Sequence, residues 1–282
     1  MPNEMFYAPD DLGQACSLLS DLGDKAIIIA GGTDLMPRFN RHRRRRTETL
    51  VYVGKLGLDF IEETNSRLVI GAATPLSDIM ASPMVKEKLP LLARACGEIA
   101  SPAVRNAATL GGNLMTNARN ADGVAALMAL GATVVTASNN GEGRMPIDQF
   151  VLTPKKEKLA KGGIVKQFEV PCLTDTDRWA WEKLKQRQGD GRSVVSVSLR
   201  ARMEGDICRS IRLVLGAMAA HPFVSKTAVQ ILEGKLFSPD LVDRVAEEIL
   251  GETDAATDTR ATAWYRQRAA QALVRRVLSQ LA

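Results

Sequence analysis

The sequence predicts an α+β fold in which a mixed region of helices and strands precedes an antiparallel sheet with helices. In the first 175 residues, short apolar runs of strand length alternate with helical patterns and with two Gly-Gly pairs. After that point, three longer stretches alternate apolar and polar residues, and two helical stretches close the chain. Hydrophobic residues make up 45% of the 282 residues, which is enough for a substantial core.

Local signals place the elements of the first part in order. A Pro-Asp-Asp start precedes apolar residues at helical spacing, and Gly23-Asp24 ends that helix. Pro75 stands in the first turn of another helix, and Pro171 closes a strand. The expected elements are a helix at 12–22, strands at 26–30 and 49–53, a helix or turn from 35 through the arginine run, a strand at 67–71, helices from 74 and at 89–99, a helix at 123–130, a strand at 132–137, a turn at 139–143 and a strand at 164–170.

A polar stretch at 173–177 is a plausible linker to the second part. Beyond it the pattern predicts strands at 179–184, 193–203 and 210–217, and the last two can pair across Glu204-Gly205-Asp206. Helices are expected at 238–250 and 262–281. This part therefore forms an antiparallel sheet with helices.

Composition excludes several kinds of protein and site. The longest nearly apolar stretch, Val124–Val135, is shorter than the ~20 residues of a membrane span, and no signal peptide is visible. The four cysteines stand apart, which excludes zinc or iron–sulfur spacing and favours reduced thiols in a cytoplasmic protein. With only His42 and His221, a histidine-rich metal site is excluded.

A basic run, Arg41–Arg46, carries much of the net charge of +5. Phosphate contact is one interpretation, and a non-enzymatic interaction or nucleic-acid module built on this run is one hypothesis for the whole chain. The run has no aromatic residue for base stacking, so we favour a solvated surface and do not expect nucleic acid as a partner. Contact with a partner subunit or an acidic surface stays open.

The two glycine pairs carry the strongest functional signal. One lies in Ile27–Leu35 and the other in Ser101–Leu114. Glycine lets a ligand approach the main chain closely, and a tight loop of such residues presents several N–H groups to an anion. The first pair is neither a Rossmann fingerprint nor a P-loop, because G-x-G-x-x-G and Gly-Lys-Ser/Thr are missing. Two such segments with matching flanks suggest a dinucleotide held between two loops.

Polar side chains near both pairs add ligand contacts. Thr33 and Asp34 could hydrogen-bond to a ligand, although Asp34 could equally cap the next helix. Thr109 and Asn113 can donate to phosphate or ribose oxygens. Asp122 can accept from a ribose or ribityl hydroxyl, and its alternative role is a helix cap.

The chain resembles the FAD-binding medium subunits of molybdenum hydroxylases, a family that includes bacterial xanthine, carbon monoxide and aldehyde dehydrogenases. The matching segments are Ala30–Leu35, Ile99–Asn113, Asp122, Glu182–Lys185 and Arg260–Arg266, and the resemblance covers essentially the whole chain. It implies a two-lobed FAD-binding domain of the vanillyl-alcohol oxidase (PCMH) type at 1–175, with lobes at 1–56 and 57–175. A domain like the C-terminal domain of the CO dehydrogenase flavoprotein would follow at 176–282.

The resemblance also implies which residues contact FAD. The glycine segments would hold the pyrophosphate and the ribityl chain, and Lys183 would approach the flavin ring, whereas the sequence by itself favours an exposed strand lysine there. The implied cofactor-binding residues are Ile29, Ala30, Gly31, Gly32, Thr33, Asp34, Leu35, Ala100, Thr109, Gly111, Gly112, Asn113, Asp122, Val165 and Lys183. No residue of this chain is expected to be catalytic or to bind a metal.

By the same resemblance, substrate would be oxidised at a molybdenum cofactor on a large subunit. Electrons would pass through [2Fe–2S] clusters on a small subunit to FAD here, and then to NAD⁺, a quinone or another acceptor. The complex would be a dimer of heterotrimers. A stand-alone flavin oxidoreductase of the same FAD fold is the alternative, although no substrate-side acid or hydroxyl donor stands out.

Four residues at three places depart from the family pattern. Gly191 stands where some relatives carry tyrosine, Met115 where many carry cysteine, and Arg119-Asn120 where many carry Ser-Pro. These changes bear on the pocket over the flavin and on the electron acceptor. The cysteine-bearing insertion of the 4-hydroxybenzoyl-CoA reductase relatives is missing, so no [4Fe–4S] cluster is expected.

Overall fold

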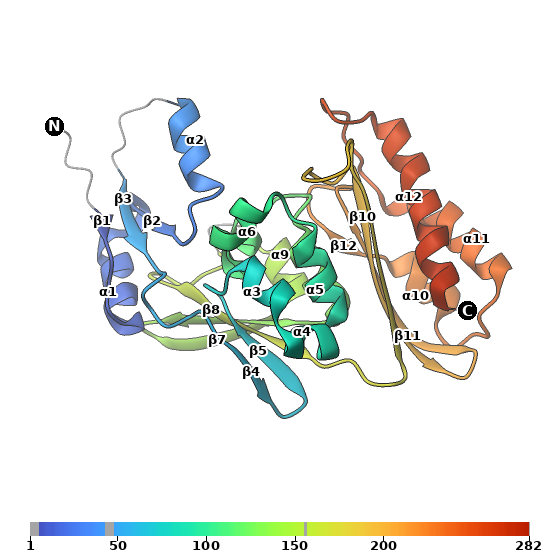
Figure 1. Ribbon diagram of the computed structural model, residues 1–282, viewed down its shortest axis with the longest axis horizontal. Coiled ribbons are helices and arrows are strands. Elements are labelled where there is room, and N and C mark those ends of the chain that lie inside the picture. The colour runs from blue at the N-terminus through green and yellow to red at the C-terminus, as the bar shows by residue number, and fades with distance from the viewer. Residues whose placement is uncertain (1–5, 43–47, 155–156, 282) are drawn as a thin grey trace.

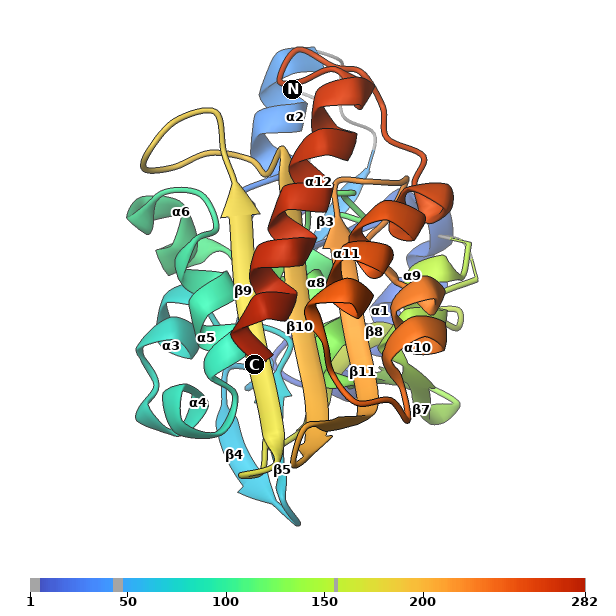
Figure 2. The same cartoon turned by 90° about the vertical axis from the view of Figure 1, so that its right-hand side faces the viewer.

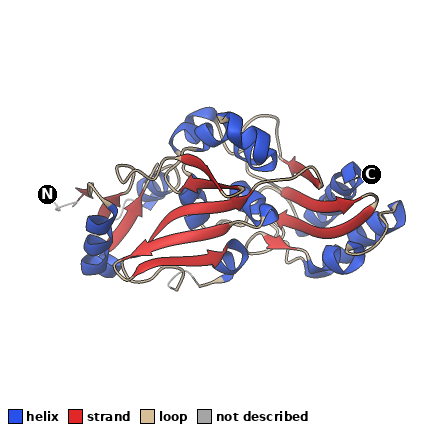
Figure 3. Ribbon diagram, turned by 90° about the horizontal axis from the view of Figure 1, so that it is seen from below, coloured by secondary structure: helices blue, strands red, loops and turns tan. Residues whose placement is uncertain are grey.

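The computed structural model describes residues 6–42, 48–154 and 157–281. Its strands form three sheets that follow one another along the molecule (Figure 3). The first is parallel, and the other two are antiparallel. The predicted α+β class, with an antiparallel sheet at the C-terminal end, is confirmed.

A small parallel sheet with the strand order β1-β3-β2 begins the chain. Its elements are β1 (Phe6–Tyr7), α1 (Leu12–Leu22), a 3₁₀ turn (Gly23–Lys25), β2 (Ala26–Ile29), α2 (Leu35–His42) and β3 (Thr49–Tyr52). The Asp11 carboxylate accepts a hydrogen bond from the Gln14 N–H and caps α1, as the start signal predicts. Residues 43–46 of the basic run lie outside the described residues, so the role of the run stays a prediction.

The middle of the chain forms a five-stranded sheet of order β4-β5-β8-β6-β7. Its elements are β4 (Ile61–Thr64), β5 (Arg67–Gly71), α3 (Leu76–Ala81), α4 (Pro83–Lys88), α5 (Pro90–Gly97), α6 (Pro102–Ala107), α7 (Leu110–Met115), α8 (Asp122–Leu130), β6 (Thr133–Ser138), β7 (Gly141–Pro146), α9 (Ile147–Leu152) and β8 (Ile164–Pro171). Helices α3 to α6 gather over one face of the sheet (Figure 1). Buried apolar side chains of α3, α4 and α5 pack with strand residues such as Leu68 and Phe168 into one core.

The last sheet has the order β12-β11-β10-β9. Its strands are β9 (Asp177–Leu184), β10 (Val195–Glu204), β11 (Ile207–Gly216) and β12 (Phe223–Val224). Its helices are α10 (Lys226–Leu232), α11 (Pro239–Glu248) and α12 (Ala263–Leu278), with 3₁₀ turns at Ile249–Glu252 and Ser279–Leu281. Glu204 pairs with Ile207, which confirms the predicted hairpin. Helix α12 crosses the outer face of this sheet (Figure 2).

Two parts of the sequence interpretation are wrong. The predicted turn at 139–143 is too long: Asn139 and Asn140 do turn between β6 and β7, but residues 141–143 belong to β7, an almost fully exposed edge strand without apolar alternation. The second glycine pair is helical: it lies in the first turn of α7, where the Thr109 hydroxyl accepts from the Gly112 N–H at 3.0 Å. The sequence also missed short elements, namely β1, β4, β12, α4, α6, α9 and α10.

Helix α8 joins the middle region to the C-terminal sheet. All of its residues are buried, and it packs against β10 and β11. At its C-terminal end, Arg200 donates to the Leu130 carbonyl at 3.1 Å and Arg212 donates to the Met128 carbonyl at 2.8 Å. These guanidinium groups satisfy helix-end carbonyls and oppose the negative end of the helix dipole. The C-terminal sheet therefore fixes the position of α8.

A buried arginine attaches α12 to the start of β10. The Arg266 side chain is 1% exposed, donates to the carbonyls of Val194 and Ala256, and pairs with Asp258 at 2.8 Å. Burial opposes ionisation of Asp258, but the Arg260 N–H and the Arg266 guanidinium outweigh burial and lower the pKa of Asp258 to about 2. The pair is therefore ionised at neutral pH.

We expect Asp258→Asn to destabilise the protein at neutral pH and to have little effect near pH 2. A carboxyl group with a lowered pKa contributes stability above its unfolded-state pKa, and this contribution disappears as the pH falls through the folded-state pKa. Thermal unfolding midpoints of wild type and variant should therefore converge between about pH 4 and about pH 2. A difference that stays constant across this window would contradict the assignment.

Candidate functional site

The two glycine segments lie against each other. A Cβ atom built on Gly31 would stand 1.7 Å from the carbonyl oxygen of Ala107, so the main chains touch at a point where only glycine fits. On its other side, the second segment is bonded to the turn before α3: the Leu76 N–H donates to the Ala108 carbonyl at 2.9 Å. The structure thus brings together the two segments that the sequence pairs.

The first glycine segment has a run of main-chain donors without acceptors. Within the described ranges, the N–H groups of Gly31, Gly32, Thr33 and Asp34 meet no acceptor, and these residues are exposed or half-buried. Gly32 has a positive φ of 67°. Successive N–H groups around a residue of this conformation are typical of main-chain turns that bind anions.

The second glycine segment, by contrast, uses its N–H groups within the chain. The Gly111 N–H donates to the Ala72 carbonyl at 2.8 Å, and the Gly112 N–H donates to the Thr109 hydroxyl. The glycine pair of the second segment therefore offers no free N–H group, whereas both glycines of the first pair do. The contribution of the second segment is close packing and side chains.

A strained turn precedes the second segment. Ala100 has a φ of 46°, a region that residues with a Cβ rarely adopt. Arg105 holds this turn, because its guanidinium donates to the carbonyls of Ile99 at 2.9 Å and Ala100 at 2.8 Å. Backbone strain of this kind concentrates at functional sites.

Asn113 presents an acceptor without a donor. Its Oδ1 atom is buried and has no hydrogen-bond partner among the described residues. A Cβ atom built on Gly123 would stand 2.8 Å from this oxygen, so the amide lies against the first turn of α8. Unpaired buried polar atoms are rare, and a ligand hydroxyl or N–H would satisfy this one.

A buried ionic cluster lies at the start of α8. Lys183 of β9 donates to Asp122 Oδ2 at 2.7 Å and to the Glu98 carbonyl at 2.8 Å, and the two ionic side chains are 1% and 4% exposed. Ser193 donates to the other carboxylate oxygen, Oδ1, at 2.6 Å. The exposed strand lysine that the sequence by itself favours is wrong, because the Lys183 side chain is buried. The helix cap allowed for Asp122 is wrong as well, because Ala121 occupies the N-cap position of α8 and no side chain caps it.

The ionic cluster has capacity for a further donor. A carboxylate offers about four acceptor sites, and Asp122 uses two of them. Cys96 lies buried nearby, and burial together with the Asp122 charge raises the pKa of its thiol to about 12. Cys96 is therefore protonated and unreactive at neutral pH.

The remaining predicted residues flank these groups. Ile29 accepts the Val53 N–H through its carbonyl at the end of β2, and Asp34 pairs with Arg38 at 2.8 Å, one turn into α2. Val165 is buried in β8. The carbonyl of the next residue, Lys166, accepts the Ala72 N–H, and the Ala72 carbonyl accepts the Gly111 N–H, so Val165 is linked to the second segment through Lys166 and Ala72.

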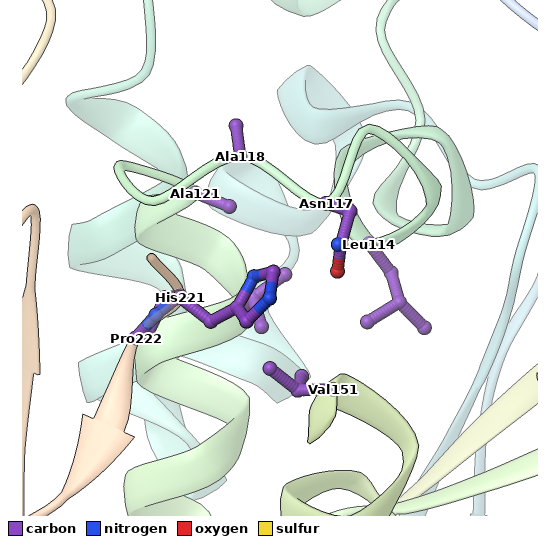
Figure 4. Close-up of a pocket in the computed structure, with 8 residues that line it drawn as sticks. Leu114, Asn117, Ala118, Ala121, Val151, His221 and Pro222 are labelled. Carbon is purple, nitrogen blue, oxygen red and sulfur yellow. The ribbon is translucent and has the colours of Figure 1, made fainter. Parts of the chain in front are cut away.

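Two hollows lie apart from most of these residues. A cavity of about 10 Å³ between α8 and the loop before β12 is lined by Asn117, Val151 and His221 (Figure 4). It has room for about one water molecule, which excludes it as a dinucleotide site. An open groove of about 420 Å³ follows α5 and shares only Glu98 with the ionic cluster.

Sequence reasoning missed Ser193 and Glu98 as parts of this site. Glu98 acts through its main chain, and Ser193 precedes a strand without any motif, so neither carries a sequence signal. Among the described residues there is no cluster of metal-ligating side chains and no helix long and apolar enough to cross a membrane.

Two family models match the chain. A model described as the FAD-binding domain in molybdopterin dehydrogenase matches residues 2–173, and one described as the CO dehydrogenase flavoprotein C-terminal domain matches residues 179–281. Together they span both regions of the fold.

Curated relatives match over nearly their whole length. The carbon monoxide dehydrogenase medium chain of Hydrogenophaga pseudoflava is 32% identical over 279 residues, covering 99% of this chain and 96% of the relative. The xanthine dehydrogenase FAD-binding subunit of Escherichia coli O157:H7 is 26% identical, covering 98% and 94%.

Solved structures of related enzymes are similar to this chain over nearly its whole length. The structure of carbon monoxide dehydrogenase from Hydrogenophaga pseudoflava matches with a TM-score of 0.93 at 32% identity, covering 99% of this chain and 97% of that one. Quinoline 2-oxidoreductase from Pseudomonas putida 86 matches with a TM-score of 0.89 at 26% identity, covering 99% and 96%.

Proposed function

The chain belongs to the family of FAD-binding medium subunits of molybdenum hydroxylases, and from that premise we propose that it holds FAD and relays electrons within a multi-subunit oxidoreductase. The observation that carries the proposal is the row of four unpaired N–H groups at Gly31–Asp34, packed against the second glycine segment. A pyrophosphate is the part of FAD that such a row fits.

We propose that the other predicted residues contact different parts of FAD. We assign the FAD pyrophosphate to Ile29–Leu35, with Ala100 in the adjoining region, and hydroxyl contacts to Thr109, Asn113 and Asp122. The assignment of Asn113 is supported by its unpaired oxygen, and that of Asp122 by its remaining acceptor capacity. Gly111, Gly112 and Val165 would line the site through their main chains. Lys183 would place a buried positive charge at the cofactor.

FAD supplies the redox chemistry, and this chain supplies binding, orientation and electrostatics. We propose that electrons arrive from [2Fe–2S] clusters of a small subunit and leave to NAD⁺, a quinone or another acceptor, while a molybdenum cofactor on a large subunit oxidises the substrate. The names of several relatives support this assembly, since they describe medium chains and a subunit of a dehydrogenase complex. A dimer of heterotrimers is the arrangement we expect.

We also propose the division into an FAD-binding domain at 1–175, with lobes at 1–56 and 57–175, and a second domain at 176–282. The three sheets support it, because they occupy successive stretches of the chain.

The purified chain should take up FAD and show the visible absorbance of a bound flavin. Titration of the apoprotein with FAD, followed by quenching of flavin fluorescence, should reach about one equivalent. The chain alone should oxidise no substrate, and activity should require co-expressed iron–sulfur and molybdopterin subunits. Failure to bind FAD would overturn the proposal, and turnover by the chain alone would favour a stand-alone flavin oxidoreductase.

A further inference from the structure

We propose that Ser193 is a positioning residue for FAD: its hydroxyl fixes the Asp122 carboxylate, so that Asp122 and Lys183 meet the cofactor in one arrangement. The inference rests on the proposed function. It adds to the site a residue that carries no motif and that comes from the C-terminal region.

Ser193 and Lys183 together determine the orientation of the carboxylate. Ser193 donates to Oδ1 at 2.6 Å and Lys183 donates to Oδ2 at 2.7 Å, so each carboxylate oxygen has its own donor. The first distance lies in the short range of charge-assisted O–H···O⁻ bonds. With one donor on each oxygen, rotation of the Asp122 side chain breaks at least one of these bonds.

The main chain at Ser193 is itself held on its C-terminal side. The N–H of Val194 donates to the Leu184 carbonyl at 2.8 Å, and the carbonyl of Val194 accepts from the buried Arg266. Ser193 is 2% exposed and leads into β10, whose first residue pairs with Leu184 of β9. Lys183 lies on β9 and Ser193 lies in the loop just before β10, so the same sheet anchors the main chain of both donors to Asp122.

This arrangement couples the two regions of the chain at the cofactor. Asp122 begins α8 in the middle region, whereas Lys183 and Ser193 belong to the C-terminal region. The same sheet holds the other end of α8 through Arg200 and Arg212. The C-terminal region thus sets the position of α8 at one end and the orientation of its functional carboxylate at the other.

Two other serines, which lie on β10 just after Ser193, show that a buried hydroxyl in this part of the chain does not need such a partner. Ser196 and Ser198 of β10 are fully buried, and their Oγ atoms have no partner among the described residues. The bond of Ser193 to a buried carboxylate is therefore a specific feature of its position. Ser198→Ala is therefore a matched control, because it removes a buried hydroxyl from the strand that Ser193 precedes.

The test compares Ser193→Ala, Ser193→Thr and Ser198→Ala in the full chain. FAD dissociation constants from fluorescence titration should rise about tenfold for Ser193→Ala, because a hydrogen bond to a charged group is lost, and should change less than about twofold for Ser198→Ala. Ser193→Thr keeps the hydroxyl and should restore most of the affinity. A general loss of packing would affect Ser193→Ala and Ser198→Ala alike.

A second measurement uses the apoprotein. A double-mutant cycle of Ser193→Ala and Asp122→Asn, read from urea unfolding, should show that the two changes are not additive. Equal FAD affinity in wild type and Ser193→Ala, or no recovery with threonine, would overturn the inference and leave the proposed function standing. If wild type binds no FAD, the proposed function fails and the FAD role of Ser193 fails with it, whereas non-additivity would still support the positioning of Asp122.

Discussion

Asp122→Asn is expected to destabilise the protein by about 3–5 kcal/mol and to abolish tight FAD binding. The Lys183 and Asp122 side chains are 1% and 4% exposed, so removing one charge leaves the other buried without its counter-ion. Desolvation of an ammonium group without a counter-ion is costly, and neutral acceptors such as the Glu98 carbonyl and the new amide oxygen offset little of that cost. Urea unfolding at neutral pH measures the change in stability, and FAD titration measures the loss of affinity.

An exposed ion pair gives the matched control for this change. Arg244 and Glu248 pair at 2.6 Å on α11, with side chains 56% and 48% exposed, and Glu248→Gln should alter the free energy of unfolding by less than about 1 kcal/mol. The double variant Asp122→Asn with Lys183→Met should recover part of the stability, because no charge stays buried. It should not recover FAD affinity. Equal stability of Asp122→Asn and Glu248→Gln would show that the buried pair contributes nothing.

The sequence predicts the long elements of the fold and misses the short or exposed ones. The α+β class and the long strands were predictable, because apolar alternation over β10 and β11 is a local property of the chain. Edge strand β7 and the short helices were not, since they are exposed or have too few residues for a period to show. Tertiary contacts determine these elements.

The site was predictable to the extent that main-chain geometry constrains residue type. The glycine pairs are recognisable in the sequence because only glycine allows two main chains to approach so closely, as the contact between Gly31 and Ala107 shows. The sequence could not predict that the two glycine pairs differ in their free N–H groups. The N–H groups of Gly111 and Gly112 donate to acceptors that only the fold brings near. The partners of Asp122 were hidden for the same reason: Lys183 and Ser193 lie 61 and 71 residues away along the chain.

Gly31→Ala is expected to remove FAD binding altogether and to destabilise the fold by more than about 3 kcal/mol. A Cβ atom there would lie 1.7 Å from the Ala107 carbonyl oxygen and 2.5 Å from its carbon. Both atoms belong to the main chain, so no side-chain rotation relieves the clash, and the two glycine segments must separate. Separation moves the N–H row of Gly31–Asp34 away from the second segment, and the site loses its shape.

Gly251→Ala is the control that isolates this effect from the mere loss of a glycine. Nothing lies within 4 Å of a Cβ atom built on Gly251, so alanine there should change the unfolding midpoint little, or raise it slightly by restricting the unfolded chain. FAD titration and urea unfolding of both variants measure the contrast. If Gly31→Ala retained FAD as tightly as Gly251→Ala, the contact between the two glycine segments would not form the cofactor site, and the pyrophosphate would have to bind elsewhere. Loss of FAD in the first variant alone would locate the anion site at the first glycine pair, where the structure has its free main-chain donors.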